Sequence, residues 1–205
     1  MADITDWSSW TELVAPTTIA MGSGTGRATL DLTDCLSGRL RINTTMLGTT
    51  VPGASVDIRV KRLAGASGGA DTTGIGVVWG MSYKPTCTIA NTTIEGDTVA
   101  VGDDHLHVAS ISNFAQGDLI AVFDSSFDRL EFHEVVGADT GLLYIDSRAI
   151  YEHTAAQADA VYDSAGGWDV FLPGGAVYEV TINYRAATTG SNVAWQVLYQ
   201  TEDYV

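Results

Sequence analysis

Polar and apolar residues alternate with a period of two along several segments of the chain. The pattern runs through residues 39–43 and 55–61, and returns near the C-terminus in residues 176–185 and 193–199. Side chains on a β-strand point alternately to its two faces, so the pattern predicts strands with one buried and one solvent-facing side. We interpret the first two segments as half-buried antiparallel strands, and residues 186–192 as a hairpin loop that joins the last two.

The middle of the chain carries shorter strand candidates, which are separated by turn residues. They are residues 98–101, 105–108, 118–123, 130–136 and 141–145. Their spacing predicts a compact barrel or sandwich. A helix is plausible only at residues 150–160, where alanines cluster, and a short loop with a helical turn fits that segment equally well.

Composition favours the same fold class. The 205 residues include 22 glycines and only two lysines, a balance that suits strands and turns better than long amphipathic helices. Apolar residues make up 45% of the chain, which is enough for one sizeable core or two small ones. We therefore expect an all-β protein: an antiparallel, jelly-roll-like β-sandwich with a small inserted β-barrel or sandwich domain.

Charge is spread unevenly and suggests where the domains lie. Residues 1–85 carry seven basic and seven acidic side chains, whereas residues 86–165 carry fourteen acids and two arginines. The last 40 residues, 166–205, are too few to bury a core unaided. We expect them to complete one β-sandwich with residues 1–85, while residues 86–165 form an acidic β domain inserted at an exposed loop.

The net charge of −15 argues against two classes of partner. A surface this acidic is repelled by phosphate, so we expect no nucleic acid and no anionic membrane among the partners. No stretch reaches the roughly 20 apolar residues of a membrane span, and residues 1–6 lack the basic start and apolar run of a signal peptide. We expect the chain to be made and to fold in a cytoplasm.

Two tryptophans stand out near the N-terminus. Trp7 and Trp10 lie in a segment, residues 6–16, that shows no strand pattern and ends at Pro16. Tryptophan offers a large contact area for little loss of entropy and is enriched at binding hot spots. We interpret the segment as an extended arm whose two tryptophans bind a neighbouring subunit. The alternative is that both close one end of the protein's own sandwich.

One histidine pair raises the question of a metal. Asp103, His105 and His107 fall on one face of a predicted strand, and a His-x-His pair with a carboxylate can bind a divalent metal. The pattern resembles the first metal motif of the cupin family, in which a glutamate follows the second histidine by four or five residues. Those positions hold Ile111 and Ser112 here, so we predict no metal and no cofactor.

Other catalytic signatures are missing from the sequence. His133 and His153 lie near glutamates, but the chain has no Gly-x-Ser-x-Gly nucleophile elbow. Residues 22–27 lack the Gly-Lys-Ser/Thr ending of a phosphate-binding loop. We interpret Cys35 and Cys87 as small apolar residues, because neither has a recognisable nucleophile context. The prediction is that the protein has no catalytic residues and is not an enzyme.

The middle segment resembles a known group of domains. From Phe114 onward it runs as a turn, a strand, a polar loop, a strand, a turn, a strand and a return strand, through residues 116–120, 131–135, 143–146 and 160–162. This succession is similar to the small β-domains of virion proteins of tailed bacteriophages, in tail-tube, baseplate and head-decoration components. The resemblance covers about 80 residues and rests on this succession of strands and turns. It implies a virion protein whose partners are the major capsid protein or other virion subunits, and which forms a homo-oligomer on the particle.

Three functions follow as hypotheses. The first is a non-enzymatic virion structural protein of a tailed phage, an accessory or decoration protein on the outside of the capsid, with a tail or head-to-tail component as its near variant. The second is a carbohydrate-binding β-sandwich that stacks sugars on tryptophans, although Trp79 and Trp195 lie within strand patterns and are typical of core. Its stacking candidates are Trp7, Trp10, Trp79, Trp168 and Trp195. The third is a cupin-like metal enzyme, which the incomplete motif disfavours.

Overall fold

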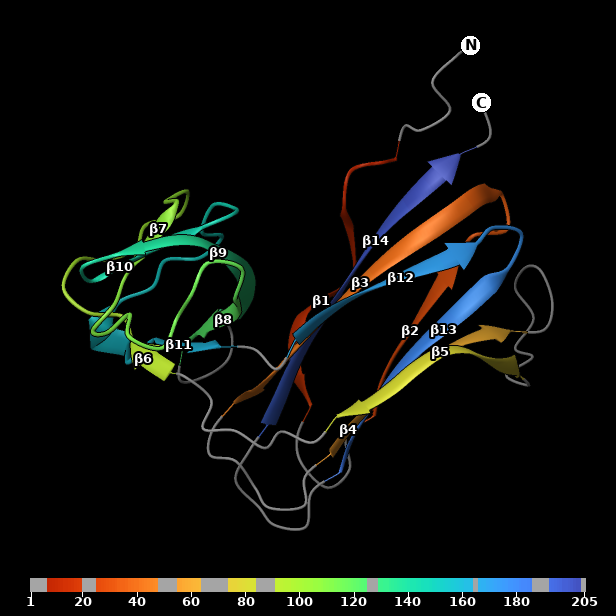
Figure 1. Ribbon diagram of the computed structural model, residues 1–205, viewed down its shortest axis with the longest axis horizontal. Helices are drawn as coiled ribbons and strands as arrows, with labels where there is room; N and C mark the ends of the chain where they lie inside the picture. The colour runs from red at the N-terminus through yellow and green to blue at the C-terminus, as the bar shows by residue number, and fades with distance from the viewer. Residues whose placement is uncertain are drawn as a thin grey trace.

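The computed structural model describes residues 7–19, 25–47, 55–63, 74–83, 91–124, 129–163, 166–185 and 192–203. Its elements are almost all β-strands (Figure 1). Eight of them are β1 (Thr11–Ile19), β2 (Thr25–Asp31), β3 (Cys35–Leu47), β4 (Ser55–Leu63), β5 (Gly74–Tyr83), β12 (Gly166–Pro173), β13 (Val177–Arg185) and β14 (Asn192–Asp203). The other six strands are β6 (Asn91–Thr93), β7 (His105–His107), β8 (Leu119–Phe123), β9 (Glu131–Asp139), β10 (Leu142–Ile145) and β11 (Ala160–Asp163). No helix in the described ranges is long and apolar enough to span a bilayer.

The eight strands β1–β5 and β12–β14 form two antiparallel sheets. One sheet has the order β1-β14-β3-β12 and the other the order β2-β13-β4-β5. Numbered along the chain among themselves, these strands lie in the orders 1-8-3-6 and 2-7-4-5. That connectivity is a jelly roll, in which two Greek keys build a double sheet. The predicted all-β, jelly-roll-like antiparallel sandwich is confirmed.

The alternation of side chains explains the core of this sandwich. On β3, Leu40 and Ile42 point inward and are fully buried, whereas Arg39 and Arg41 point to the other face. The same inward set comes from both sheets, and Trp195 is buried among it. Burying a large apolar side chain stabilises the fold by about 1.5–3 kcal/mol, so the shared core holds the two sheets together.

The predicted hairpin at residues 186–192 is wrong. β13 pairs with β2 and β4, whereas β14 pairs with β1 and β3, so these consecutive strands lie in different sheets. Alternation gives a strand one buried face but does not identify its partner. Both sheets bury their inner faces in one core about 10 Å thick, and a short connection between Arg185 and Asn192 is long enough to pass from one sheet to the other.

The six strands β6–β11 close into a barrel. They form one sheet in the order β6-β11-β8-β9-β10-β7. Its two edges meet just beyond β6 and β7, where Ile94 bridges Val108, the Ala109 N–H donates to the Thr93 carbonyl at 3.0 Å and the Glu95 N–H donates to the His107 carbonyl at 3.0 Å. The barrel strands lie between β5 and β12 in the chain. Of the two forms expected for the inserted unit, a barrel or a sandwich, the structure has the barrel.

One face of the barrel rests on the sandwich (Figure 1). Ile120 and Val122 on β8 belong to the barrel's own core, whereas Phe123 points to the other side. There Phe123 and Phe132 pack in a small apolar cluster that includes Ala194 of β14, which is fully buried. The barrel is therefore attached to the outer face of the β1-β14-β3-β12 sheet.

Two segments with weak sequence patterns form only a 3-10 turn and a single β-bridge. In residues 150–160, where a helix and a loop with a helical turn were both open, the structure has the turn, the 3-10 segment η1 (Ala155–Gln157). The strand expected at residues 98–101 is reduced to one bridge between Val99 and His153. Four residues are too few to establish the alternation on which the strand prediction at residues 98–101 rested.

Separate folding of the sandwich and the barrel remains a prediction. We expect that replacing residues 86–165 by a short Gly-Ser bridge leaves a folded β protein, because the sandwich core is built from β1–β5 and β12–β14 and exposed loops tolerate such changes. Circular dichroism and thermal unfolding of the excised variant test this. A variant without a cooperative transition would contradict the two-unit interpretation.

Candidate interaction surface

The outer face of the β1-β14-β3-β12 sheet contacts the barrel at one end and the N-terminal segment at the other. Toward one end Asn43, Thr45 and Ala194 are buried at the barrel, and the Thr45 hydroxyl donates to the Asp163 carbonyl at 3.0 Å. Toward the other end the sheet presents arginine and aromatic side chains beside the N-terminal segment. We call this second set the aromatic–arginine patch; it consists of Trp7, Trp10, Arg39, Arg41 and Phe171.

Trp10 lies at the centre of this patch. The Arg39 guanidinium carbon is 5.3 Å from the centre of the Trp10 ring, and that of Arg41 is 5.0 Å from it. Arg39 also lies 5.2 Å from the ring centre of Phe171, which is 67% exposed. Each such cation–π contact contributes about 0.5–1 kcal/mol at an exposed site. The patch therefore combines an ordered cationic centre with a freely exposed aromatic ring.

An acidic residue orients the two arginines. Asp169 on β12 pairs across the sheet with Arg41 and accepts hydrogen bonds from both Arg39 and Arg41, the Arg41 Nε–Oδ1 distance being 3.0 Å. Burial opposes ionisation of the Asp169 carboxyl, but the hydrogen bonds from Arg41 and Arg39 outweigh it and lower its pKa. The hydrogen bond to Asp169 in turn raises the pKa of Arg41. Asp169 is ionised at neutral pH; its two oxygens fix the Arg41 guanidinium by a two-point contact, and a single hydrogen bond holds that of Arg39.

The N-terminal segment is held in place by β14. Trp7 bridges Glu202, the Ser8 N–H donates to the Thr201 carbonyl at 2.9 Å, and the Thr201 N–H donates to Ser8 Oγ at 2.9 Å. The Trp7 ring meets Phe171 edge to face, with 6.3 Å between ring centres. Trp7 and Trp10 are both half-buried. The segment thus lies along its own sandwich and keeps part of each indole exposed.

The idea that residues 6–16 have no strand partner is wrong for most of that segment. Thr11 to Pro16 belong to β1, which pairs with β14. The pairing shifts register between Val14 and Thr17, and Pro16 lies within that shift. Proline has no N–H to donate, but β1 is an edge strand, where a missing donor and an irregularity are tolerated. Pro16 was therefore a poor marker of the end of the arm, because β1 runs on to Ile19.

A cleft of about 220 Å³ separates the patch from the barrel. Polar side chains from both units line it, together with Leu119 and the glycines 117 and 167; they are Arg41, Asn43, Glu134 and Asp169. Asn43 is 3% exposed, and its amide donates to Gln196 Oε1 at 3.0 Å. Arg41 and Asp169 already pair with each other here, and an ionised Asp169 cannot act as a general acid.

The histidines noted near glutamates belong to a buried network inside the barrel. His153 Nε2 lies 2.8 Å from Glu131 Oε1 and its Nδ1 lies 3.0 Å from Asp159 Oδ2, and all three residues are 0% exposed. His133 Nε2 is 3.4 Å from the other Glu131 oxygen, and the Ile150 N–H donates to that oxygen at 2.7 Å. A substrate cannot reach side chains without exposed surface, so this network supports the barrel rather than chemistry.

The His105 and His107 pair lies on the short strand β7. The two rings contact each other at 5.1 Å between centres, and His105 Nδ1 is 2.9 Å from Asp104 Oδ1. Asp103 turns instead to the backbone, where its carboxylate accepts from the Ala100 N–H at 2.8 Å. Within the described ranges no three His, Cys, Asp or Glu side chains are placed to hold a metal ion. Cys35 is half-buried against the sandwich core, and Cys87 lies outside the described residues.

Sequence reasoning singled out Trp7 and Trp10 but missed their neighbours. For residues 39–43, which contain Arg39 and Arg41, the alternation predicts only a strand with one buried and one solvent-facing side. Phe171 carried a usable signal, because it stands between the buried Val170 and Leu172 at a position where alternation expects a polar residue. An apolar residue in the polar phase of a strand points to a contact surface.

Comparisons with known proteins give little. No protein-family model and no curated protein matches the chain. Among solved structures, VP17, a capsid protein of bacteriophage P23-77, is 9% identical over 98% of this chain and 99% of its own, with a TM-score of 0.21. The VP2 subviral particle of infectious bursal disease virus is 11% identical, covers 98% and 82%, and has a TM-score of 0.23. The VP16–VP17 complex of the two major capsid proteins of bacteriophage P23-77 is 10% identical, covers 96% and 100%, and has a TM-score of 0.20. Scores this low do not establish a shared fold, and the jelly-roll assignment rests on strand order alone.

Proposed function

We propose that this chain is a non-enzymatic virion structural protein of a tailed phage, an accessory protein that binds the outside of the capsid. The observation that carries the proposal is the aromatic–arginine patch on the outer face of a jelly roll. Tryptophan and arginine are among the residues most enriched at protein–protein hot spots. Jelly rolls serve as viral capsid domains, as lectins and as cupins, so the choice among these uses depends on the surface chemistry.

The patch fits a protein partner better than a sugar. Stacking of a sugar needs an open aromatic face, but Arg39 and Arg41 cover Trp10, and Arg39 also lies over the Phe171 ring. Trp195 is 3% exposed. Trp79 and Trp168 pack against the sandwich core. An enzyme is disfavoured as well, because the histidine–carboxylate network of the barrel has no exposed surface. A tail or head-to-tail location is the near variant of the proposal.

The partner that we propose is the major capsid protein, on which the chain forms a homo-oligomer that follows the particle's symmetry. The virion is its final location, after synthesis in the host cytoplasm. Many copies on one lattice make weak contacts effective, because each bound copy raises the local concentration of the next. Neither a cofactor nor a nucleic acid has a part in this role.

Co-sedimentation with capsids prepared from the phage that encodes the chain tests the proposal. We expect the purified protein to pellet with the capsids and to saturate at a stoichiometry set by their symmetry, and we expect a glycan array to stay blank. Tails separated from the same lysate serve as the second binding target and distinguish the near variant. A protein that binds neither particle and instead binds a defined glycan would replace the proposal with the lectin hypothesis.

A further inference from the structure

The outer face of the second sheet, β2-β13-β4-β5, carries cations that have no acidic partner among the described residues. Arg59 and Lys61 on β4 both point to this face. No described carboxylate lies within 4.0 Å of either side chain, whereas Arg27 pairs with Glu179 at 3.1 Å on the same face. In a protein with 25 acids and 10 bases, adjacent unpaired cations on one strand are unusual. They create a local positive surface on an acidic molecule.

Exposed valines adjoin these cations. Val77 on the edge strand β5 lies opposite Lys61, and Val78 follows it at a register shift; they are 53% and 49% exposed. Trp79 of β5 is partly buried and points to the opposite face, where it packs against the sandwich core. Valines at such exposures beside charged groups are the composition expected of a protein contact, where an apolar centre is rimmed by charges. We call Arg59, Lys61, Val77 and Val78 the β4–β5 patch.

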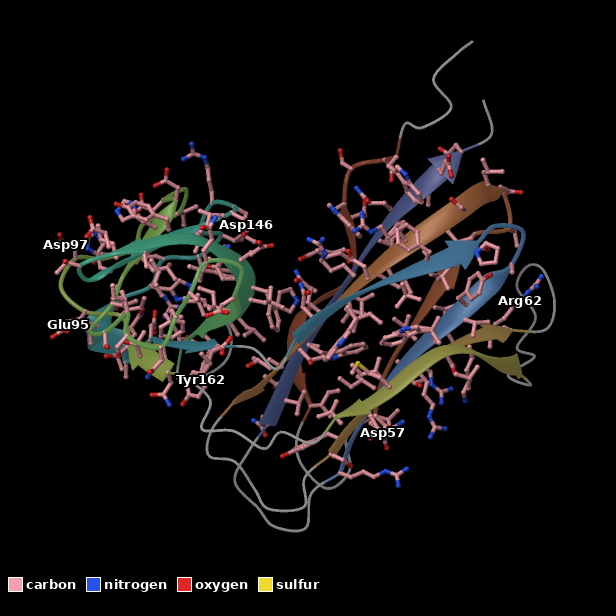
Figure 2. The ribbon with its side chains drawn as sticks, viewed as in Figure 1. Asp57, Arg62, Glu95, Asp97, Asp146 and Tyr162 are labelled. Carbon is pink, nitrogen blue, oxygen red and sulfur yellow. The ribbon has the colours of Figure 1, made fainter. Side chains whose placement is uncertain are left out.

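The acidic surface that complements this patch lies at the far end of the same molecule. Glu95 and Asp97 follow β6 on the barrel, and both are exposed. Figure 2 shows them at one end of the longest dimension of the molecule, while Arg62, at the end of β4, lies at the other. The barrel segment, residues 86–165, carries fourteen acids and two arginines. The two ends of the molecule therefore differ in local charge, with the acidic end at the barrel.

From this arrangement we infer that the β4–β5 patch binds the acidic end of the barrel, at Glu95 and Asp97, of a second copy of the chain. The contact is head to tail, because the two surfaces lie at opposite ends and cannot meet within one molecule. Contacts of this heterologous kind build rings or open rows of copies. Two barrel ends repel each other, so the alternative of barrel on barrel is disfavoured.

The contact is expected to be weak in solution. Exposed ion pairs contribute little individually, and the overall negative charge of both copies opposes their approach. At about 0.15 M salt the Debye length is about 8 Å, which screens the long-range repulsion but leaves pairs in direct contact. This is the behaviour of a subunit that associates with its neighbours once they are held on a common surface.

A pair of charge-reversed variants tests the inference by sedimentation velocity. The first carries Arg59→Glu and Lys61→Glu, and the second carries Glu95→Lys and Asp97→Lys. We expect each variant alone to lose at least about tenfold in self-association relative to the wild type. We expect the equimolar mixture to regain self-association. The reversed patch of the first variant then meets the reversed barrel end of the second, and the native patch of the second meets the native barrel end of the first. Both variants remain strongly acidic overall, so general attraction between them does not explain recovery.

All four positions are at or near the surface, and unchanged circular dichroism and melting curves check that each variant is folded. Either of two results would overturn the inference. One is a dissociation constant above about 1 mM for self-association of the wild type, and the other is a mixture that associates no better than the separate variants. The contact is a property of the isolated chain and does not depend on the proposed function. Failure here therefore leaves capsid binding to be judged by co-sedimentation.

Discussion

Substitution of Glu131 by glutamine is expected to lower the free energy of unfolding of the barrel by about 3–5 kcal/mol, the usual cost of removing one partner from a buried charged pair. Glu131 is fully buried, and its two oxygens face His153 Nε2 at 2.8 Å and His133 Nε2 at 3.4 Å. Glutamine keeps the size of the side chain but removes its charge. The ring nitrogens of His153 and His133 then face a neutral amide in place of the carboxylate.

The same network predicts a dependence on pH. Burial raises the pKa of Glu131, but His133 and His153 oppose it and bring the value down from 4.5 to about 2. A carboxyl with a lowered pKa in the folded state contributes stability above its unfolded pKa and loses it as pH falls through the folded value. The wild-type barrel should therefore lose stability between about pH 4.5 and pH 2, and Glu131→Gln should remove this part of the pH dependence.

The chain allows the two units to be followed separately. Residues 86–165 contain no tryptophan, so tryptophan fluorescence reports on the sandwich, and amide hydrogen exchange of β8 and β9 reports on the barrel. Glu134→Gln is the matched control, because it makes the same change at an exposed position of the same strand. We expect that control to alter stability by no more than about 0.5 kcal/mol. Equal effects of the two substitutions would contradict the role given to the buried network.

Replacing Trp7 and Trp10 by alanine is expected to weaken capsid binding by about a thousandfold while lowering the melting temperature of the isolated protein only modestly. Hot-spot tryptophans are each worth about 2 kcal/mol or more, and about 4 kcal/mol corresponds to roughly a thousandfold in affinity. Within the protein itself the substitutions remove two cation–π interactions and one edge-to-face aromatic pair on an outer surface, each worth about 1 kcal/mol.

Two single substitutions make this prediction sharper. Phe171→Ser removes a ring that is 67% exposed, so it should weaken capsid binding while lowering stability only slightly, through the loss of its contacts with Arg39 and Trp7. Ile150→Ser removes a side chain that is 56% exposed on the barrel and should leave binding unchanged. Quantitative pelleting with capsids and thermal unfolding measure the two properties. Full capsid binding by Trp7→Ala/Trp10→Ala, combined with a large fall in melting temperature, would assign both tryptophans to the sandwich alone.

The sequence predicted the strands well because strand patterns are local. Residues 39–43 and 55–61 alternate, and they lie in β3 and β4 as expected. Sheet membership was not predictable in the same way, because a strand with one apolar face fits either sheet of a sandwich. That is why β13 and β14 were taken for a hairpin, and why the edge strand β1 was missed at Pro16.

The candidate surface was predictable only in part, and for a similar reason. Trp7 and Trp10 were visible as tryptophans outside any clear pattern. Their partners Arg39 and Phe171 are more than 130 residues apart in the sequence, and only the antiparallel pairing of β3 with β12 places them opposite each other. The buried network of Glu131, His153 and Asp159 has the same origin. Contacts that depend on register cannot be read from the residues on one strand.

Electron cryo-microscopy of capsids saturated with the protein tests the proposed capsid attachment most directly. We expect density for the jelly roll at symmetry-related positions on the outside of the capsid, with Trp10 and Phe171 against the capsid surface. Saturated particles that lack such density, or that carry the protein with Trp10 and Phe171 facing solvent, would contradict the proposal.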